Sequence, residues 1–566
     1  MRAGVEGWIA EDPDPGDRAE LRELLDRASA GLPGAEAELR DRFAGRLTFG
    51  TAGLRGAVAA GPNRMNRAVV KAATAAVVGW LAEAGPAAVA VGCDARHRSA
   101  DFAGEAARVL AGAGIGVHML PVPCPTPLLA FAVRHLGAAA GVMITASHNP
   151  AADNGYKLYL GDGAQVIPPV DAQIEQRIAG LGPLQAIPLA DAGSPLITRH
   201  GDEITRAYLD AVVAVAAGAT AGAGRPELNV VYTPMHGVAG TLMLRAVAAA
   251  GFAPPHVVAA QAEPDPGFPT APFPNPEEPG ALDLALADAR RLGADLVLAS
   301  DPDGDRLGVA VPRNGEWVVL TGDQVGALLG ASLLRRTAAE KGARLVATTI
   351  VSSTLLSKIA AAAGAGYAET LTGFKWIARA ADGRPGMRLV FGYEEALGYM
   401  VGEVVRDKDG IGAALAMLRL AEQAKADGRS VLDRYDELET AHGVHLTAQI
   451  APRTAVVAQV MSGLRADPPQ VLGGEPVTSV TDLRADGPAG LPAADVLIFA
   501  LPGARVVIRP SGTEPKIKCY LQVTEPLAGR PLAAARAAAA GRLAPLRPAL
   551  AALLTGDSRH GEAAAG

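Results

Sequence analysis

The feature that most constrains this 566-residue chain is an order of strands and helices that occurs three times. In the first third, the apolar run Ala88–Val91 leads into the polar loop GCDARHRS and then into helical and strand-like stretches. The last apolar run, Gly141–Ile144, ends in TASHNP. Short apolar runs that alternate with helical patterns and are separated by Gly, Pro or polar residues are typical of alternating strands and helices. We therefore predict a β-α-β-α-β unit whose last strand leads into a polar loop.

The same order returns twice further along the chain. The second copy runs from NVVY through TLMLRAVAAAG and the strand-like PHVVAA to ADLVLA, and it ends in SDPDGDR. The third runs from RLVATTIV through LLSKIAAAAGA, GYAETL and the helix-like KWIARAA to MRLVF, and it ends in GYEEALGYM. Three such copies predict three related α/β domains.

The C-terminal part of the chain has a different pattern. Strand-like runs such as HLTAQIA, ADVLIFAL, ARVVIRP and IKCYLQV predict an antiparallel sheet with one or two helices. The predicted fold class is thus α/β, with three similar α/β domains that have mixed sheets and a fourth, smaller α+β domain. The predicted boundaries are 1–45 for a helical N-terminal extension, 46–205, 206–318 and 319–440 for the three repeats, and 441–566 for the last domain with a closing helix at 531–554 and a loose tail.

Composition narrows the class of protein. Hydrophobic residues make up 49% of the chain, which is enough for several cores and excludes disorder of the whole chain. The net charge of −7 and the lack of a basic stripe argue against a nucleic-acid partner. Three widely spaced cysteines fit a reduced compartment. We see no signal peptide and no unbroken apolar run of membrane-spanning length, so we expect a cytoplasmic protein without a membrane segment.

Three aspartates follow the last strand of the second copy. In DPDGDR, Asp301, Asp303 and Asp305 alternate with Pro302 and Gly304, which favour a tight turn on which the carboxylates converge. Such carboxylates repel one another unless a cation lies among them, and hard oxygen ligands select Mg²⁺ or Ca²⁺. The spacing does not fit the Gly and Glu positions of a calcium-binding EF-hand loop. We therefore predict one Mg²⁺ ion that shares a phosphate oxygen, and the alternative is a solvated acidic turn.

A serine follows the last strand of the first copy. Ser147 lies in TASHNP beside His148, and the G-x-S-x-G pattern of a nucleophile elbow is absent. A nearby metal ion could make the hydroxyl competent in phosphoryl chemistry by neutralising charge on the transferred group. The alternatives are a helix N-cap for Ser147 and structural hydrogen bonding for His148.

The stretch RPSGTEPK at 509–516 has the composition of an anion-binding loop. Arg509 offers a planar fork for phosphate, and Ser511, Gly512 and Thr513 offer hydroxyl and backbone donors. The P-loop pattern is missing, so a nucleoside triphosphate is not implied. The alternative is an ordinary surface turn.

Other charged residues lie in short polar or glycine-rich motifs. Glu394 and Glu395 in GYEEALGYM could accept hydrogen bonds from sugar hydroxyls or could be two solvated charges. Arg55 in GTAGLRG, Lys157 in NGYK and Lys375 in TGFKWI could each contact a phosphate or move a proton. Most isolated Lys and Arg residues do neither.

Taken in chain order, FGTAGLRG, GCDARHRS, TASHNP, NGYK, DPDGDR, TGFKW, GYEEALGY and RPSGTEPK resemble the motifs of the α-D-phosphohexomutase superfamily, which contains phosphoglucomutases and phosphomannomutases. The resemblance runs from about residue 46 to about residue 525. It implies four domains around one central cleft, and a longer subgroup that also includes phosphopentomutases.

The resemblance also implies roles for individual residues. Ser147 corresponds to the phosphoserine of the active enzyme, and its oxygen completes the Mg²⁺ site. The implied assignments are Ser147, Asp301, Asp303 and Asp305 for the metal, His148, Lys157 and Arg55 for acid–base and charge-stabilising work, and Arg306, Lys375, Glu394, Glu395, Arg509, Ser511, Gly512 and Thr513 for substrate binding. The implied partner is a small-molecule sugar phosphate, with a sugar 1,6-bisphosphate as activator and intermediate, and the protein is expected to be a monomer or dimer.

The activity implied is that of an isomerase that interconverts glucose 1-phosphate and glucose 6-phosphate, with mannose phosphates as a further option. The sugar loop departs from the G-E-x-S-G of many relatives, because Ala396 replaces the usual Ser in GYEEALGY. The preferred sugar therefore stays open, with a phosphopentomutase as the alternative. A Mg²⁺-dependent sugar phosphatase is a further alternative, and a catalytically silent binder would need neither the serine nor the acidic triplet.

Overall fold

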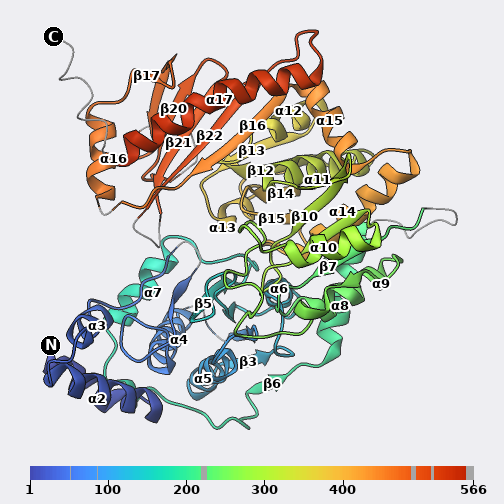
Figure 1. The fold of residues 1–566 in the computed structure, drawn as a ribbon. Coiled ribbons are helices and arrows are strands. Elements are labelled where there is room, and N and C mark those ends of the chain that lie inside the picture. The colour runs from blue at the N-terminus through green and yellow to red at the C-terminus, as the bar shows by residue number, and fades with distance from the viewer. Residues whose placement is uncertain are drawn as a thin grey trace, which may run out of the picture. The chain divides into compact units, whose positions relative to one another are not determined.

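The structure is a computed structural model that describes residues 1–50, 53–83, 85, 87–217, 226–454, 456–485, 492–511 and 516–555 (Figure 1). The chain forms two compact units. The first unit consists of Met1–Leu320 together with Ala396–Ala426, and the second consists of Thr321–Glu395 together with the chain from Asp427 onward. The segment 396–426 therefore leaves the neighbouring parts of the chain and packs with the first unit.

The N-terminal extension is helical. It contains α1 (Arg2–Glu11), α2 (Pro15–Ser29) and α3 (Ala35–Arg42), which bury a small apolar core that includes Val5, Leu21 and Leu39. The start of α2 is determined by Asp14, whose carboxylate accepts hydrogen bonds from the amides of the first turn, and by Pro at the first helical position.

The first repeat folds around a six-stranded mixed sheet. Its strands are β1 (Leu54–Ala57), β2 (Ala88–Cys93), β3 (Gly116–Met119), β4 (Ala140–Ile144), β5 (Asp153–Leu160) and β6 (Ile197–Arg199), in the order β1-β5-β4-β2-β3-β6. The strand β2 runs parallel to β3 and β4, whereas β5 runs antiparallel to β4 and β1. The helices are α4 (Arg67–Leu81), α5 (Ser99–Gly112), α6 (Thr126–His135) and α7 (Val170–Ala179), and a short 3₁₀ turn lies at Leu184–Ala186.

The second repeat contains a five-stranded mixed sheet. Its strands are β7 (Val230–Thr233), β8 (His256–Val257), β9 (Leu296–Ala299), β10 (Gly308–Arg313) and β11 (Glu316–Val319), in the order β11-β10-β9-β7-β8. The helices are α8 (Asp202–Val212), which continues into a π-helical turn at Val213–Ala217, α9 (Gly240–Ala249) and α10 (Asp283–Leu292). From the segment 396–426 come β15 (Gly398–Val401) and α14 (Gly410–Ala426), and α14 packs against α9.

One predicted strand of this repeat is mostly wrong. Of PHVVAA, only the two residues of β8 are extended, and a 3₁₀ turn follows at Ala259–Gln261. The turn buries Gln261, whose side-chain oxygen accepts a hydrogen bond from Thr233 at 2.6 Å. Satisfying this buried amide outweighs the local preference of the apolar run for a strand.

The second unit starts with the third repeat. The central strand β12 (Ala343–Thr349) pairs in parallel with β13 (Gly366–Thr370) and β14 (Met387–Glu394). The helices are α11 (Gly322–Arg336), α12 (Leu355–Ala362), α13 (Phe374–Ile377) and α15 (Val431–His442). The predicted helix KWIARAA is thus only partly correct, because α13 ends at Ile377.

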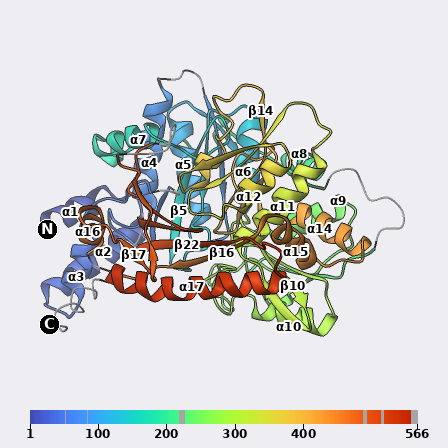
Figure 2. The same cartoon turned by 90° about the horizontal axis from the view of Figure 1, so that it is seen from above.

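The last sheet is antiparallel, as predicted. Its strands are β16 (Val444–Ile450), β19 (Ser479–Asp482), β20 (Leu497–Leu501), β21 (Ala504–Pro510) and β22 (Ile517–Glu525), in the order β16-β22-β21-β20-β19. The remaining elements are α16 (Val457–Ala466), the short pair β17 (Val471–Leu472) and β18 (Glu475–Pro476), and the closing helix α17 (Leu532–Thr555). Figure 2 shows α17 lying along β16 and β22, with Ala535, Ala539 and Leu546 buried against the sheet.

The predicted fold class is confirmed, with three α/β repeats followed by an antiparallel α+β domain. Among the described residues, no helix is both long enough and apolar enough to span a membrane.

Candidate active site

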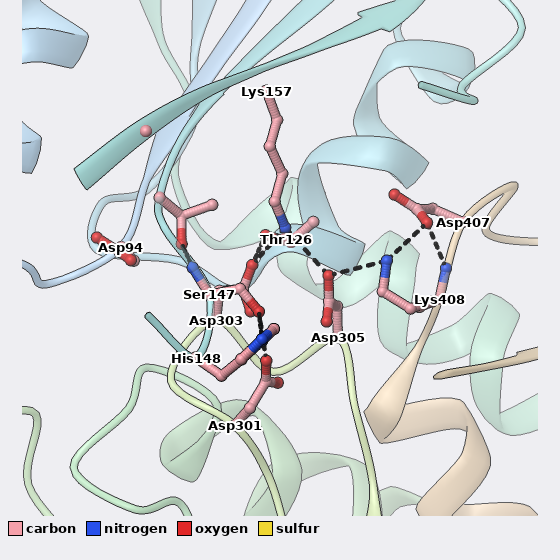
Figure 3. Close-up of polar contacts among 12 residues, drawn as sticks. Asp94, Thr126, Ser147, His148, Lys157, Asp301, Asp303, Asp305, Asp407 and Lys408 are labelled. Carbon is pink, nitrogen blue, oxygen red and sulfur yellow. Dashed lines mark hydrogen bonds and ion pairs between the residues drawn. The ribbon is translucent and has the colours of Figure 1, made fainter. Parts of the chain in front are cut away.

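The loop after β4 presents a serine hydroxyl. Ser147 has a backbone φ of 53°, which lies in the left-handed region that non-glycine residues rarely adopt. Its amide donates to Oγ1 of Thr145 at 2.9 Å, and its Oγ donates to Oδ2 of Asp301 at 2.6 Å (Figure 3). The side chain is buried. The loop therefore holds one hydroxyl in a fixed direction against a carboxylate.

Three aspartates in the loop after β9 form an acidic cluster. Asp301, Asp303 and Asp305 are fully buried, and each offers a carboxylate oxygen within 4.8 Å of the others. Gly304 has a φ of 70°, and a Cβ on it would lie 2.8 Å from the Cβ of Ala239, so the turn requires glycine.

The acidic cluster fits a hard divalent cation. The Oδ1 atoms of Asp303 and Asp305 are buried and have no hydrogen-bond partner in the described part of the chain. Burial and repulsion from its two neighbours raise the pKa of Asp301 well above its usual range. A cation among the three carboxylates removes both penalties, and oxygen-only donors at close range suit Mg²⁺.

Lys157 on β5 supplies positive charge at one side of the cluster. Its Nζ lies 2.6 Å from Oδ2 of Asp303 and 3.1 Å from Oδ2 of Asp305. Thr126, the first residue of α6, donates its hydroxyl to the same Asp303 oxygen at 2.7 Å. Burial lowers the pKa of Lys157, but the two carboxylates outweigh burial and leave this pKa raised, so the amine stays protonated.

A second lysine at the cluster was not among the predicted residues. Lys408 lies between β15 and α14, and its Nζ is 3.3 Å from Oδ2 of Asp305 and 3.3 Å from Oδ1 of Asp407. The other oxygen of Asp407 accepts hydrogen bonds from Tyr159 and Gln165, both at 2.7 Å. The charged run RDKDG before a helix was the only local signal, because the approach of residue 408 to residue 305 depends on the fold.

His148, Arg55 and Arg306 surround the serine. Nδ1 of His148 lies 3.2 Å from Oγ of Ser147. Burial, followed by Arg306 and Arg55, holds the pKa of His148 well below its usual range, so the imidazole is neutral at pH 7. Arg55 on β1 donates to the side-chain oxygen of Asn149 at 3.2 Å, and Nε of Arg306 lies 4.0 Å from Oδ2 of Asp301. The predicted site residues that lie in the first unit are thus close together, with the serine, the lysine and the three aspartates buried and His148, Arg55 and Arg306 half-buried.

Part of the predicted sugar and phosphate site lies in the second unit. Glu394 is the last residue of β14, and the next residue, Glu395, accepts hydrogen bonds from the hydroxyls of Thr349 and Ser352, both at 3.3 Å. Burial, and then the nearby Asp323, raises the pKa of Glu395, whereas Arg509 opposes this shift.

Arg509 lies at the end of β21, close to the aromatic ring of Tyr520. Its Nη2 donates to the Tyr520 hydroxyl at 3.3 Å, and its guanidinium carbon lies 5.8 Å from the ring centre. The amide of Ser511 donates to the carbonyl of Lys516 at 2.9 Å, which closes the base of the loop. Gly512 and Thr513 lie outside the described residues.

Lys375 lies in α13 and is buried, with its Nζ 5.9 Å from the ring centre of Trp376.

Four family models match the chain. They are described as phosphoglucomutase/phosphomannomutase alpha/beta/alpha domains I, II and III and the C-terminal domain, and they match residues 46–183, 206–315, 321–440 and 473–539. A probable phosphomannomutase of Haemophilus influenzae is 40% identical over 471 residues, which cover 81% of this chain and 92% of the relative. The chain belongs to the phosphoglucomutase/phosphomannomutase family.

Two further relatives match most of the chain. A probable phosphoribomutase of Schizosaccharomyces pombe is 36% identical over 558 residues, which cover 91% of this chain and 92% of the relative. The crystal structure of a putative phosphomannomutase from Thermus thermophilus has a TM-score of 0.65 at 26% identity, with 88% of this chain and 99% of that chain covered. These relatives are named as phosphomutases, which are isomerases, but their names cover different sugars.

Proposed function

We propose that this protein is a phosphosugar mutase that interconverts glucose 1-phosphate and glucose 6-phosphate through a phosphorylated Ser147 and a glucose 1,6-bisphosphate intermediate. The main support is the 2.6 Å hydrogen bond between the Ser147 hydroxyl and Asp301, inside a buried cluster of three carboxylates. A buried hydroxyl at such a cluster is where a metal-assisted phosphoryl transfer would take place.

Different residues of the chain would bind the metal ion and stabilise the charge of the phosphoryl group during transfer. Asp301, Asp303 and Asp305 would hold Mg²⁺, which supplies charge neutralisation on the transferred phosphoryl group. Lys157, Arg306 and Arg55 add fixed positive charge around the phosphoryl oxygens. Lys157 is buried and hydrogen-bonded to two of the aspartates, so its charge needs little reorganisation during transfer.

His148 is the group best placed to move the proton. Its neutral imidazole lies 3.2 Å from the Ser147 oxygen, within reach of a hydroxyl that attacks or leaves at this position. In the first half-reaction, the sugar hydroxyl would lose its proton to His148 as it attacks the phosphoserine, and His148 would pass this proton to the leaving Ser147 oxygen. In the second, His148 would take the proton of the Ser147 hydroxyl as that hydroxyl attacks the bisphosphate, and would pass it to the leaving sugar oxygen.

The other predicted residues would bind the parts of the sugar phosphate that do not react. Glu394 and Glu395 would accept hydrogen bonds from sugar hydroxyls, with Lys375 as a further donor. Arg509, Ser511, Gly512 and Thr513 would hold the phosphate at the far end of the sugar.

A pentose phosphate is a second candidate substrate. It is favoured by the match of the S. pombe probable phosphoribomutase to 91% of the chain and by Ala396 in the sugar loop. Comparing kcat/KM for glucose 1-phosphate, mannose 1-phosphate and ribose 1-phosphate, each with its bisphosphate, decides among the sugars. We expect glucose 1-phosphate to give the highest value, and a higher value for ribose 1-phosphate would transfer the assignment to pentoses.

Replacement of the serine tests the transfer route itself. Ser147→Ala should abolish mutase turnover and the gain of about 80 Da that one phosphate adds to the peptide containing residue 147. Ser332→Ala, which truncates another buried serine on α11, is the matched control and should keep both. Retained turnover in Ser147→Ala would exclude the phosphoserine route, and release of inorganic phosphate by the unaltered protein in place of isomer would indicate a phosphatase.

A further inference from the structure

Arg96 binds the backbone of the loop that carries Ser147 (residues 147–153, called the serine loop), and both lie in the first unit. It lies in GCDARHRS, the polar loop after β2, and its guanidinium is buried. Nη2 donates to the carbonyls of Ser147 at 2.6 Å and of Asn149 at 2.5 Å. Nη1 donates to the carbonyls of Pro150 at 2.7 Å and of Asp153 at 3.1 Å. One side chain therefore binds four carbonyl groups of the loop 147–153.

The guanidinium is itself held in place from both sides. Oδ2 of Asp94 lies 3.5 Å from Nε of Arg96, and Oδ1 of Asp94 accepts hydrogen bonds from the Arg96 amide at 3.0 Å and from the Ser99 hydroxyl at 2.6 Å. On the other side, the guanidinium carbon lies 4.9 Å from the ring centre of Phe268, which belongs to the second repeat. Arg96 thus links the serine loop to the repeat that carries the acidic cluster.

The bond to the Ser147 carbonyl has a specific consequence. The left-handed backbone of Ser147 costs free energy for a residue with a Cβ, so it persists only where its surroundings enforce it. Without the anchor on its carbonyl, the residue can relax to a negative φ, which turns Oγ away from Asp301. The hydrogen bonds of the Arg96 guanidinium go to backbone carbonyls of the loop, and none of them involves the side chain of Ser147.

We propose that Arg96 is a positioning residue for phosphoryl transfer, which aims the Ser147 hydroxyl at the acidic cluster by fixing four carbonyls of its loop. This proposal rests on the proposed function. It predicts an effect on the rate of transfer rather than on the binding of the sugar phosphate, because Arg96 acts on the reacting serine and not on the substrate.

The test compares three variants with the unaltered protein. Arg96→Ala removes the guanidinium group, and Arg96→Lys keeps the positive charge but donates hydrogen bonds from a single nitrogen. Arg98→Ala is the control, because it removes a neighbouring arginine whose guanidinium donates to Asp17 and Asp14 instead. The measurements are kcat and KM for the preferred sugar phosphate, the unfolding temperature, and the effect of added guanidinium ion at concentrations far below those that unfold the protein.

We expect kcat to fall by about 100-fold in Arg96→Ala and Arg96→Lys, because a misplaced reacting group costs about this factor, whereas KM should change little. Guanidinium ion should restore part of the kcat of Arg96→Ala, but it should not change that of Arg98→Ala. Rescue separates positioning from a general loss of structure, since a misfolded variant does not regain activity from a small cation.

Four results would overturn the proposal. They are an unchanged kcat in either Arg96 variant, a rise in KM at constant kcat, the absence of guanidinium rescue in a folded Arg96→Ala, and a failure of Arg96→Lys to fold, which would make Arg96 a purely structural residue. Failure of the proposed function looks different, because the unaltered protein then lacks mutase activity.

Discussion

Removing the charge of Lys157 should destabilise the metal-free protein strongly. In Lys157→Met, Asp303 keeps only the Thr126 hydroxyl on Oδ2, and its Oδ1 already has no hydrogen-bond partner among the described residues. Asp305 keeps Lys408 at 3.3 Å, so most of the loss falls on Asp303. Taking one partner from a buried ion pair costs about 3–5 kcal/mol, because the remaining charge stays desolvated.

The expected loss is large enough to measure by thermal unfolding. For a domain of roughly 150–250 residues, a loss of about 3–5 kcal/mol corresponds to a decrease in Tm of roughly 6–20 °C. The assay follows the unfolding transition of the first repeat in buffer with EDTA and then with Mg²⁺. Mg²⁺ should raise the Tm of Lys157→Met more than that of the unaltered protein, because a cation at the three aspartates replaces the lost positive charge.

Lys71 on α4 provides the matched control. It is also buried, burial lowers the pKa of its amine, and it makes no ion pair in the part of the chain that the structure describes. Lys71→Met should therefore leave Tm nearly unchanged or raise it, since the variant no longer buries an ammonium group. If Lys157→Met in EDTA loses no more stability than Lys71→Met, then Asp303 and Asp305 are not ionised partners of Lys157 and the electrostatic reasoning is wrong.

Three further perturbations test other parts of the molecule. Asp303→Asn should weaken Mg²⁺ binding by roughly 100-fold because one ligand charge is lost, and titration calorimetry would contradict the metal assignment if the affinity were unchanged. Burial raises the pKa of Asp409 from 3.8 to about 6 despite hydrogen bonds from the Gly412 amide and the Tyr208 hydroxyl. A raised carboxyl pKa means that the folded state binds the proton more tightly, so stability should rise by about 3 kcal/mol as pH falls from about 6 to about 4, and Asp409→Asn should remove this component of the unfolding profile. Arg509→Ala should raise KM for the sugar phosphate by a larger factor than it lowers the phosphorylated fraction of Ser147. If kinetics and mass spectrometry show that both change by the same factor, the variant is misfolded.

The local sequence predicted the acidic cluster because its three carboxylates lie within five residues. The carboxylates of Asp301, Asp303 and Asp305 need only a tight turn to converge, and Pro302 and Gly304 encode that turn. Strands and helices of the repeats could be predicted for the same reason, since their periodicity is local. Exceptions such as β8 arise where a buried side chain, here Gln261, needs a hydrogen bond that the local pattern does not show.

The amino-acid sequence by itself determined which chemical groups are present and in which loops they lie. It also determined the three α/β domains and the α+β domain that carry these loops. Tertiary structure alone decided that the segment 396–426 returns to the first unit and brings Lys408 to Asp305, and that Arg96 spans from β2 to the serine loop. The physical reason is that such contacts join residues about fifty to one hundred positions apart. Their free energy comes from the burial and pairing of charges, which exist only after the sheets have packed.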